Sequence, residues 1–240
     1  MSLTPLPPAI EEIHQKALKG HLLEIVQWGQ ILLKSVHVPP NPSEAFAWFK
    51  IASDAGFGPG QNMLGRCFQF GWGCHKDLLQ AASLYEKAAQ TGYEWGRYNL
   101  GILIMRGMGQ PQNLPKAFDL FRIAAQNGHA KSMNLYARFL EEGWGTVQNT
   151  SDALIWYRKS AENGDYRGQH NYATALVDKG KIDEALDWWR KAILTATSDI
   201  LLAMHRQITA LHDDKDPDLL AHVEERLKEM GIRPPHPPPP

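Results

Sequence analysis

The chain has 240 residues, of which 43% are hydrophobic and 21% are charged, as is ordinary for a folded globular protein. Its 25 Lys and Arg residues nearly balance its 26 Asp and Glu residues, so the net charge is −1. This balance argues against a strong attraction to nucleic acid or to an acidic membrane surface. No stretch reaches the roughly 18 apolar residues of a membrane span, and the first eight residues do not resemble a secretory signal. We therefore expect a cytoplasmic protein that binds neither nucleic acid nor membrane.

The first elements expected along the chain are a disordered segment over residues 1–7 and a leading cap helix over residues 8–20. A 36-residue period then organises residues 21–195. Small residues mark this period, because they recur at the same phase: Ala9, Ala45, Ala81, Ala117 and Ala153, with Gly20, Gly56, Gly92, Gly128 and Gly164. Fixed periods of this length are typical of repeat architectures, in which stacked units build one elongated array.

One half of each unit predicts an amphipathic helix. In residues 41–56, apolar side chains recur at the spacing of one helical face. Asn41 is suited to cap this helix, Pro42 to its first turn, and Gly56 to its end. Pairs of bulky residues keep the same step in this helix: Trp48-Phe49, Leu84-Tyr85, Leu120-Phe121 and Trp156-Tyr157. Trp48, Trp156 and Trp188 are expected at core positions of this helix.

The other half of each unit predicts a second helix that ends in a Gly-x-Gly loop. Residues 93–107 are one example, and Gly101 lies inside this helix, where it costs about 1 kcal/mol relative to Ala. Because a small residue recurs at this phase, we expect the neighbouring helix to approach closely. No alternating strand pattern is present, so the predicted fold class is all-α.

These residues resemble a known family, the Sel1-like repeat. The resemblance rests on Leu64-Gly65, on Gly71-Trp72-Gly73, and on the run from Ala81 through Leu84-Tyr85 to Gly92. It covers roughly residues 20–195. It implies a right-handed α/α solenoid related to tetratricopeptide repeats, with the Leu-Gly helices (A helices) on the concave side and the other helices (B helices) on the convex side.

The last unit and the end of the chain depart from the period. The step from Ala153 to Ala185 is 32 residues, and this unit reads like a tetratricopeptide repeat. Residues 196–231 are expected to close the array with helices over 198–212 and 217–230. The proline-rich residues 232–240 favour polyproline II and are expected to be a disordered tail, or alternatively a ligand for a proline-recognising module.

The resemblance places several polar side chains of the A helices along the concave groove. Asparagine amides there would bind a peptide backbone, and the cations would bind carboxylates. The alternative is that the asparagines only pack between units. The groove candidates are Asn62, Arg66, Gln69, Tyr98, Asn99, Arg106, Lys131, Asn134, Arg138, Glu141, Arg167, His170 and Asn171. Trp72 and Trp144 in the Gly-x-Gly loops form a candidate docking edge.

No motif for chemistry accompanies this array. Phosphate-binding loops, serine elbows and metal-ligand spacings are missing, and Cys67 and Cys74 favour reduced thiols. We therefore expect no catalytic residue, cofactor or metal. The leading hypothesis is a monomeric, non-enzymatic scaffold or adaptor for a partner protein or extended peptide. The alternatives are a self-assembling structural solenoid, or a β-lactam-binding or hydrolysing enzyme such as the disulfide-rich members of the family.

Overall fold

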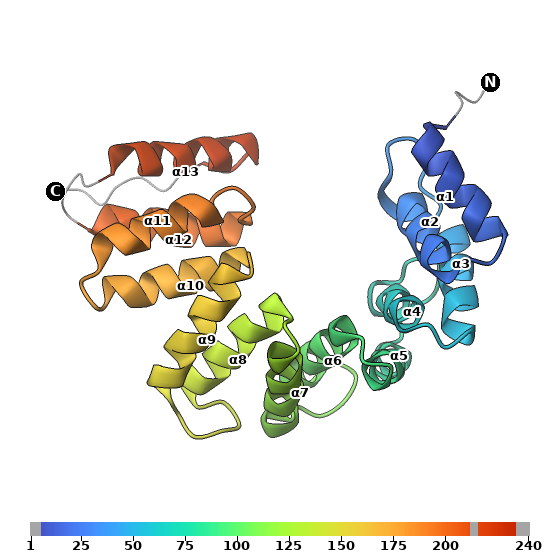
Figure 1. Cartoon of the computed structure of the whole chain (residues 1–240), viewed down its shortest axis with the longest axis horizontal. Helices are drawn as coiled ribbons and strands as arrows, with labels where there is room; N and C mark the ends of the chain where they lie inside the picture. The colour runs from blue at the N-terminus through green and yellow to red at the C-terminus, as the bar shows by residue number, and fades with distance from the viewer. Residues whose placement is uncertain (1–5, 212–215, 234–240) are drawn as a thin grey trace. The chain divides into compact units, whose positions relative to one another are not determined.

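The computed structural model describes residues 6–211 and 216–233. These ranges form thirteen α-helices and no strand, which confirms the predicted all-α class (Figure 1). The first seven helices are α1 (Pro8–Leu18), α2 (Leu22–Lys34), α3 (Pro42–Asp54), α4 (Gly58–Phe70), α5 (Leu78–Gln90), α6 (Glu94–Arg106) and α7 (Leu114–Gln126). The others are α8 (Ala130–Glu142), α9 (Thr150–Glu162), α10 (Tyr166–Val177), α11 (Ile182–Ala192), α12 (Ser198–Ala210) and α13 (Pro217–Glu229). No described helix combines the length and apolar character needed to cross a bilayer.

The chain divides into two compact units, Met1–Ala124 and Ala125–Pro240. In each unit, successive helices pack on one another, as α4 does on α5 and α8 on α9. The A helices also contact one another across the intervening B helix: α2 contacts α4 and α4 contacts α6 in the first unit, and α8 contacts α10 in the second. Each unit is therefore a stack of helix pairs in which the A helices form a continuous layer.

Small residues in the A helices allow the aromatic side chains of the B helices to approach. A Cβ atom added to Gly101 would lie 2.7 Å from Cε1 of Phe121, which is fully buried. Gly65 has the same relation to Tyr85, at 2.8 Å. The predicted close approach at Gly101 is thus confirmed, and aromatic burial against the glycine face compensates its cost in helix propensity.

Helix ends follow the sequence signals. The side chain of Asn41 accepts a hydrogen bond from the backbone N–H of Glu44 at 3.2 Å, and Asn149 caps α9 in the same way at 3.0 Å. Gly71 ends α4 in the left-handed conformation with φ of 77°. These caps satisfy backbone groups that a helix terminus would otherwise leave without partners.

The tryptophans expected at core positions of the B helices are only partly buried. In each bulky pair the second residue enters the core, so that Phe49, Tyr157 and Trp189 are fully or almost fully buried. Trp156 and Trp188, the first residues of their pairs, are half-buried instead. The expectation for these tryptophans was therefore wrong in part, because adjacent helical residues point about 100° apart and the second residue of each pair faces the A helix more directly.

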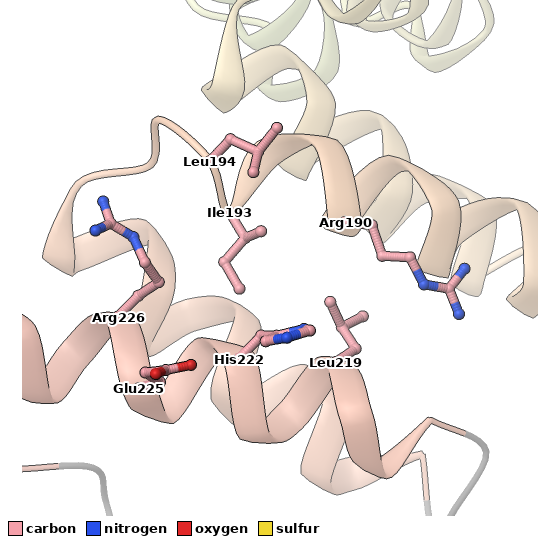
Figure 2. A pocket seen from close by; sticks show the side chains of 7 residues that line it. All are labelled: Arg190, Ile193, Leu194, Leu219, His222, Glu225 and Arg226. Atoms are coloured by element: carbon pink, nitrogen blue, oxygen red, sulfur yellow. The ribbon is translucent and has the colours of Figure 1, made fainter.

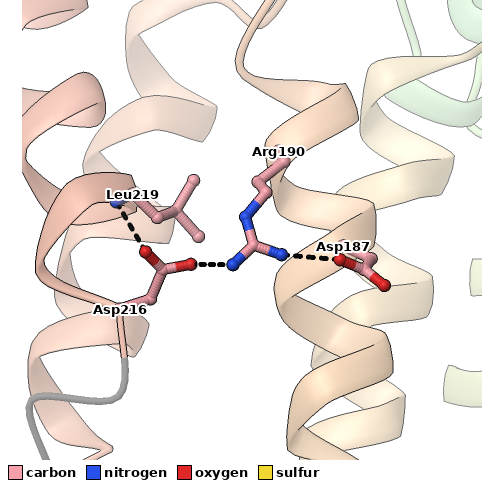
Figure 3. Close-up of polar contacts among 4 residues, drawn as sticks. All are labelled: Asp187, Arg190, Asp216 and Leu219. Carbon is pink, nitrogen blue, oxygen red and sulfur yellow. Dashed lines mark hydrogen bonds and ion pairs between the residues drawn. The ribbon is translucent and has the colours of Figure 1, made fainter.

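Two helices occupy the region where a closing pair was predicted, α12 and α13. Asp216 caps α13, because its carboxylate accepts from the backbone N–H of Leu219 at 2.9 Å (Figure 3). Leu219, Val223 and Leu227 bury one face of α13. The expected disordered segments, residues 1–7 and 232–240, lie almost entirely outside the described residues.

Candidate partner-binding surface

The candidate groove residues lie on four A helices and the loops that follow them. Helices α4 and α6 carry the first set, in the first unit, and α8 and α10 carry the second set, in the second unit. Each set is described within its own unit.

The asparagines connect neighbouring A helices. Nδ2 of Asn99 in α6 donates to Oδ1 of Asn62 in α4 at 2.8 Å, and Asn171 in α10 donates to Asn134 in α8 at the same distance. Asn62 and Asn134 are almost completely buried, with 4% and 5% of their surfaces exposed. Part of each amide is thus used in packing between helix pairs, which is the alternative role that the sequence left open.

Two further candidates hold the end of an A helix against the following B helix. The Tyr85 hydroxyl donates to Oε1 of Gln69 at 2.5 Å, and the Tyr157 hydroxyl donates to Oε2 of Glu141 at 2.7 Å. Burial, and then the hydrogen bond to Glu141, raises the pKa of Tyr157 well above its ordinary value. Tyr157 therefore stays neutral and keeps donating to Glu141.

The two arginines lie over the tryptophans of the Gly-x-Gly loops. Cζ of Arg66 is 5.0 Å from the ring centroid of Trp72, and Cζ of Arg138 is 5.1 Å from that of Trp144. Within the described residues, neither guanidinium forms an ion pair with a carboxylate. A guanidinium stacked on a ring keeps its N–H groups at the edge of the plane, where they remain able to donate. Each unit thus presents one pair in which an A-helix arginine stacks on the tryptophan of a Gly-x-Gly loop.

The remaining candidates differ in what they can offer a partner. Arg106 is exposed at the end of α6. Arg167 lies over the Tyr166 ring at 4.6 Å and pairs with Asp199 at 4.0 Å. Tyr98 packs edge-on against neighbouring rings of the first unit, and Lys131 is half-buried.

His170 is enclosed in the second unit. Its ring stacks near Trp189 with a centroid distance of 6.4 Å, and its Nδ1 atom is buried without a hydrogen-bond partner among the described residues. Burial lowers the pKa of His170 to about 4, although the charge of Asp199 opposes this effect. The imidazole is therefore neutral near pH 7 and does not add a cation to the surface.

Sequence reasoning missed Phe70 and the alternation of the repeats. Phe70 is 53% exposed and stacks on Trp72 with ring centroids 5.0 Å apart. Arg66 and Arg138 stand 72 residues apart, as do Trp72 and Trp144, whereas Met108 takes the loop position between the tryptophans. A comparison of every second repeat, rather than of every repeat, would have revealed that repeats with an arginine and a tryptophan alternate with a repeat that lacks them.

Groups suited to chemistry are not gathered at this surface. Among the described residues, no three His, Cys, Asp or Glu side chains lie together in a way that could hold a metal ion. Cys67 and Cys74 are free thiols, and burial raises the pKa of Cys67 to about 12, so it is a poor nucleophile at neutral pH.

Comparisons with known proteins agree with this architecture. A family profile described as the Sel1 repeat matches residues 26–57, 58–93, 96–129, 130–165 and 170–194. A solved Sel1 repeat protein from Oxalobacter formigenes is 24% identical, with a TM-score of 0.73 over 86% of this chain and 84% of that chain. A protective antigen of uropathogenic Escherichia coli with an SLR fold is 23% identical, with a TM-score of 0.68 over 93% of this chain and 49% of that chain. An immunity protein from Pseudomonas aeruginosa is 18% identical, with a TM-score of 0.59 over 99% and 91% of the two chains. No protein of curated function matches the sequence.

Proposed function

Because the chain belongs to the Sel1 repeat family, whose repeats are generally protein–protein interaction modules, we propose that it is a monomeric, non-enzymatic scaffold or adaptor in the cytoplasm. It binds a partner protein, or an extended segment of one, on the layer of A helices in each unit. The layered A helices support this proposal, since they offer a continuous surface rather than an enclosed pocket for a reaction.

One observation carries the proposal: the cation–aromatic pair of Arg138 and Trp144, repeated in the other unit by Arg66 and Trp72. Arginine and tryptophan are the residue types that most often dominate binding energy in interfaces. The asparagines beside them, and the side chains that bind tyrosine hydroxyls, already have partners within the fold. The arginine guanidiniums are therefore the groups best able to donate hydrogen bonds to a partner.

The chemistry of these pairs indicates an acidic partner. A guanidinium without a carboxylate of its own can form two parallel hydrogen bonds to an Asp or Glu side chain. The tryptophan below it provides apolar area for a neighbouring side chain of the same segment. We therefore propose a partner segment in which acidic and apolar residues alternate or adjoin.

Affinity capture from native lysate, followed by mass spectrometry, tests the proposal. The wild-type chain should recover a partner that the double variant Arg66→Ala/Arg138→Ala loses. This variant leaves the asparagine hydrogen bonds in place, so circular dichroism and the thermal midpoint should stay close to the wild type.

The matched control is Arg122→Ala/Arg158→Ala, which removes the same charge from the B helices α7 and α9. Both control residues pair with acids on their own helix, at 3.1 and 2.8 Å. Equal loss of the partner in both variants would mean that net charge, not this surface, governs binding. Undiminished recovery by Arg66→Ala/Arg138→Ala would refute the proposed surface, and light scattering of the same samples would show whether the chain self-assembles instead.

A further inference from the structure

The loops that join each A helix to the following B helix form one edge of each unit. We define the first loop edge as the segments of the first unit that run from the last residue of an A helix to the first turn of the next B helix: residues 34–44, 70–80 and 106–116. Neighbouring segments touch, because Gly73 lies against the carbonyl oxygen of Pro42, and a Cβ added to Gly109 would lie 2.6 Å from Cβ of Leu78. The first loop edge is therefore a continuous surface.

Apolar side chains protrude from the first loop edge. Val36, Trp72 and Met108 stand 36 residues apart, so each occupies the same position in one of the three loops. Val36 is 93% exposed, whereas Trp72 and Met108 are half-buried. Phe70 and Leu79 on the same edge are exposed as well. Exposed apolar groups gathered on one surface are a feature of interaction sites.

Cations without acidic partners surround these apolar groups. The first loop edge carries four exposed basic side chains: Lys34, Lys76, Arg106 and Lys116. None of them forms an ion pair with a residue that the structure describes, since the ion pairs of this unit join other side chains along single helices. Their charges are therefore available to an anionic partner.

The acids of the first loop edge, Glu44 and Asp77, both serve helix starts. Oδ1 of Asp77 accepts from the backbone N–H groups of Leu79 and Gln80 at 2.9 and 3.0 Å, and Glu44 accepts from the Asn41 amide at 3.0 Å. The helix dipoles add little charge, since each loop joins the negative end of an A helix to the positive end of a B helix. The first loop edge is therefore net positive.

The corresponding edge of the second unit is net negative. By the same definition it comprises residues 142–152 and 177–184, and its basic side chains are Lys179 and Lys181. Its acids are more numerous: Glu142, Asp152, Asp178, Asp183 and Glu184. The net charge of −1 for the whole chain thus averages two edges of opposite sign, which the composition conceals.

A groove in the second unit lacks this combination of apolar groups and free cations. It has a volume of about 520 Å³ and lies between the end of α11 and the side of α13, where Leu194 is part of its lining (Figure 2). Its arginines already pair with acids, Arg190 with Asp216 and Arg226 with Glu229. The first loop edge is therefore the surface better suited to an anionic partner.

We propose that the first loop edge binds the surface of an anionic phospholipid bilayer. Its lysines and arginine face the headgroups, while Val36 and the ring of Trp72 enter the interfacial layer, which tryptophan prefers. A bilayer suits this edge better than a folded protein, because side chains that protrude from loops need no matching pockets in a fluid surface. The edge would hold the scaffold at a membrane while the layer of A helices holds the partner of the proposed function.

Flotation of the full-length chain with lipid vesicles tests this binding. One set of vesicles contains phosphatidylcholine alone, and the other also contains about 30 mol % phosphatidylserine, an anionic lipid of the cytoplasmic leaflet. The wild type should float with the anionic vesicles and not with the neutral ones. Salt at about 1 M should release it, because the Debye length then falls to about 3 Å.

A pair of lysine variants tests the role of the cations. Lys34→Gln/Lys76→Gln should weaken partition onto the anionic vesicles about 25-fold, since each Lys or Arg near such a surface contributes about fivefold. The matched control is Lys179→Gln/Lys181→Gln, which removes the same charge from the edge of the second unit and should leave partition unchanged. All four lysines are exposed, so the fold tolerates both changes.

A pair of valine variants tests the apolar contact. Val36→Asp removes the most exposed apolar group of the first loop edge and adds a negative charge, so it should weaken partition about tenfold or more. Val147→Asp is the matched control, because Val147 is 86% exposed in a loop of the second unit. It should leave partition unchanged.

Three results would overturn the proposal: no binding to the anionic vesicles, equal binding to the neutral vesicles, or equal losses in the test and control variants. Sedimentation velocity without vesicles adds a fourth. If the wild type self-associates and Lys34→Gln/Lys76→Gln weakens this, with no vesicle binding, the first loop edge binds the negative edge of a second copy instead. The vesicle assay contains no partner protein and changes neither Arg66 nor Arg138, so failure here is separable from failure of the proposed partner surface.

Discussion

The enclosed imidazole of His170 should make the stability of the second unit depend on pH. Its pKa is about 4 in the folded chain, against an ordinary value of 6.5. As the pH falls below about 6.5, the unfolded chain takes up the proton first, so protonation favours unfolding. The free energy of unfolding is therefore unaffected by this site above about pH 7, and it decreases progressively as the pH falls toward 4.

The magnitude follows from these two pKa values. Near pH 5, almost all unfolded chains but only about one folded chain in ten would carry the proton at this site, which corresponds to a loss of about 2 kcal/mol relative to pH 7.5. The variant His170→Asn removes the titration. Asparagine is a compatible replacement, since Asn134 occupies the same phase one repeat earlier and is buried.

Urea unfolding of both chains at about pH 7.5 and pH 5, followed by tryptophan fluorescence, measures the effect. The free energy of unfolding should fall by about 2 kcal/mol more in the wild type than in the variant. Asp165, whose pKa is also shifted and which is not among the groups that act on His170, titrates in both chains and cancels in this comparison. Equal pH dependence in the two chains would refute the reasoning and indicate that water enters the site and solvates the imidazolium.

Three further substitutions or reactions test the packing. Gly73→Ala should lower the thermal midpoint more than Gly92→Ala. Both glycines have positive φ, so an added Cβ costs about 1–2 kcal/mol at either position. At Gly73 the Cβ would also lie 2.2 Å from a carbonyl oxygen of α3. Equal shifts of the thermal midpoint in the two variants would contradict this reasoning. Asn99→Ala should cost about 1–3 kcal/mol in urea unfolding, because its buried amide partner loses its donor, and a neutral effect would count against the inter-helix bond. Alkylation followed by mass spectrometry should modify Cys74 well before Cys67, whose thiol is fully buried; equal rates would contradict that burial.

The fold was predictable from the sequence because each signal acts locally or at the fixed repeat spacing. Asn41 and Asn149 cap the helices that follow them, and Gly71 ends the helix that precedes it. The small residue at Gly101 predicted the close approach of a neighbouring helix, and the ring of Phe121 makes that approach. These interactions need no knowledge of distant parts of the chain.

The polar surface was less predictable, because the role of a side chain depends on a partner in another helix. Asn62 lies at a groove position in sequence, but its hydrogen bond to Asn99 forms only when two A helices stack. Glu141 likewise meets Tyr157 across a loop. The groove at Leu194 arises from the spacing of α11 and α13, which are not successive helices, so no local pattern encodes it.

The shortened last repeat indicates how much freedom the connecting loops have. The step from Ala153 to Ala185 is four residues shorter than the period, and only Asp178 to Lys181 separate α10 from α11. Ala173 and Trp189 are nevertheless fully buried. So are Ala137, at the same phase as Gly101, and Phe49, Tyr85 and Phe121 of the longer units. Since the hydrophobic core tolerates this deletion, the turns are natural hosts for inserted sequence. Foreign epitopes grafted into these turns would be displayed on a scaffold whose core packing does not depend on the length of the insert.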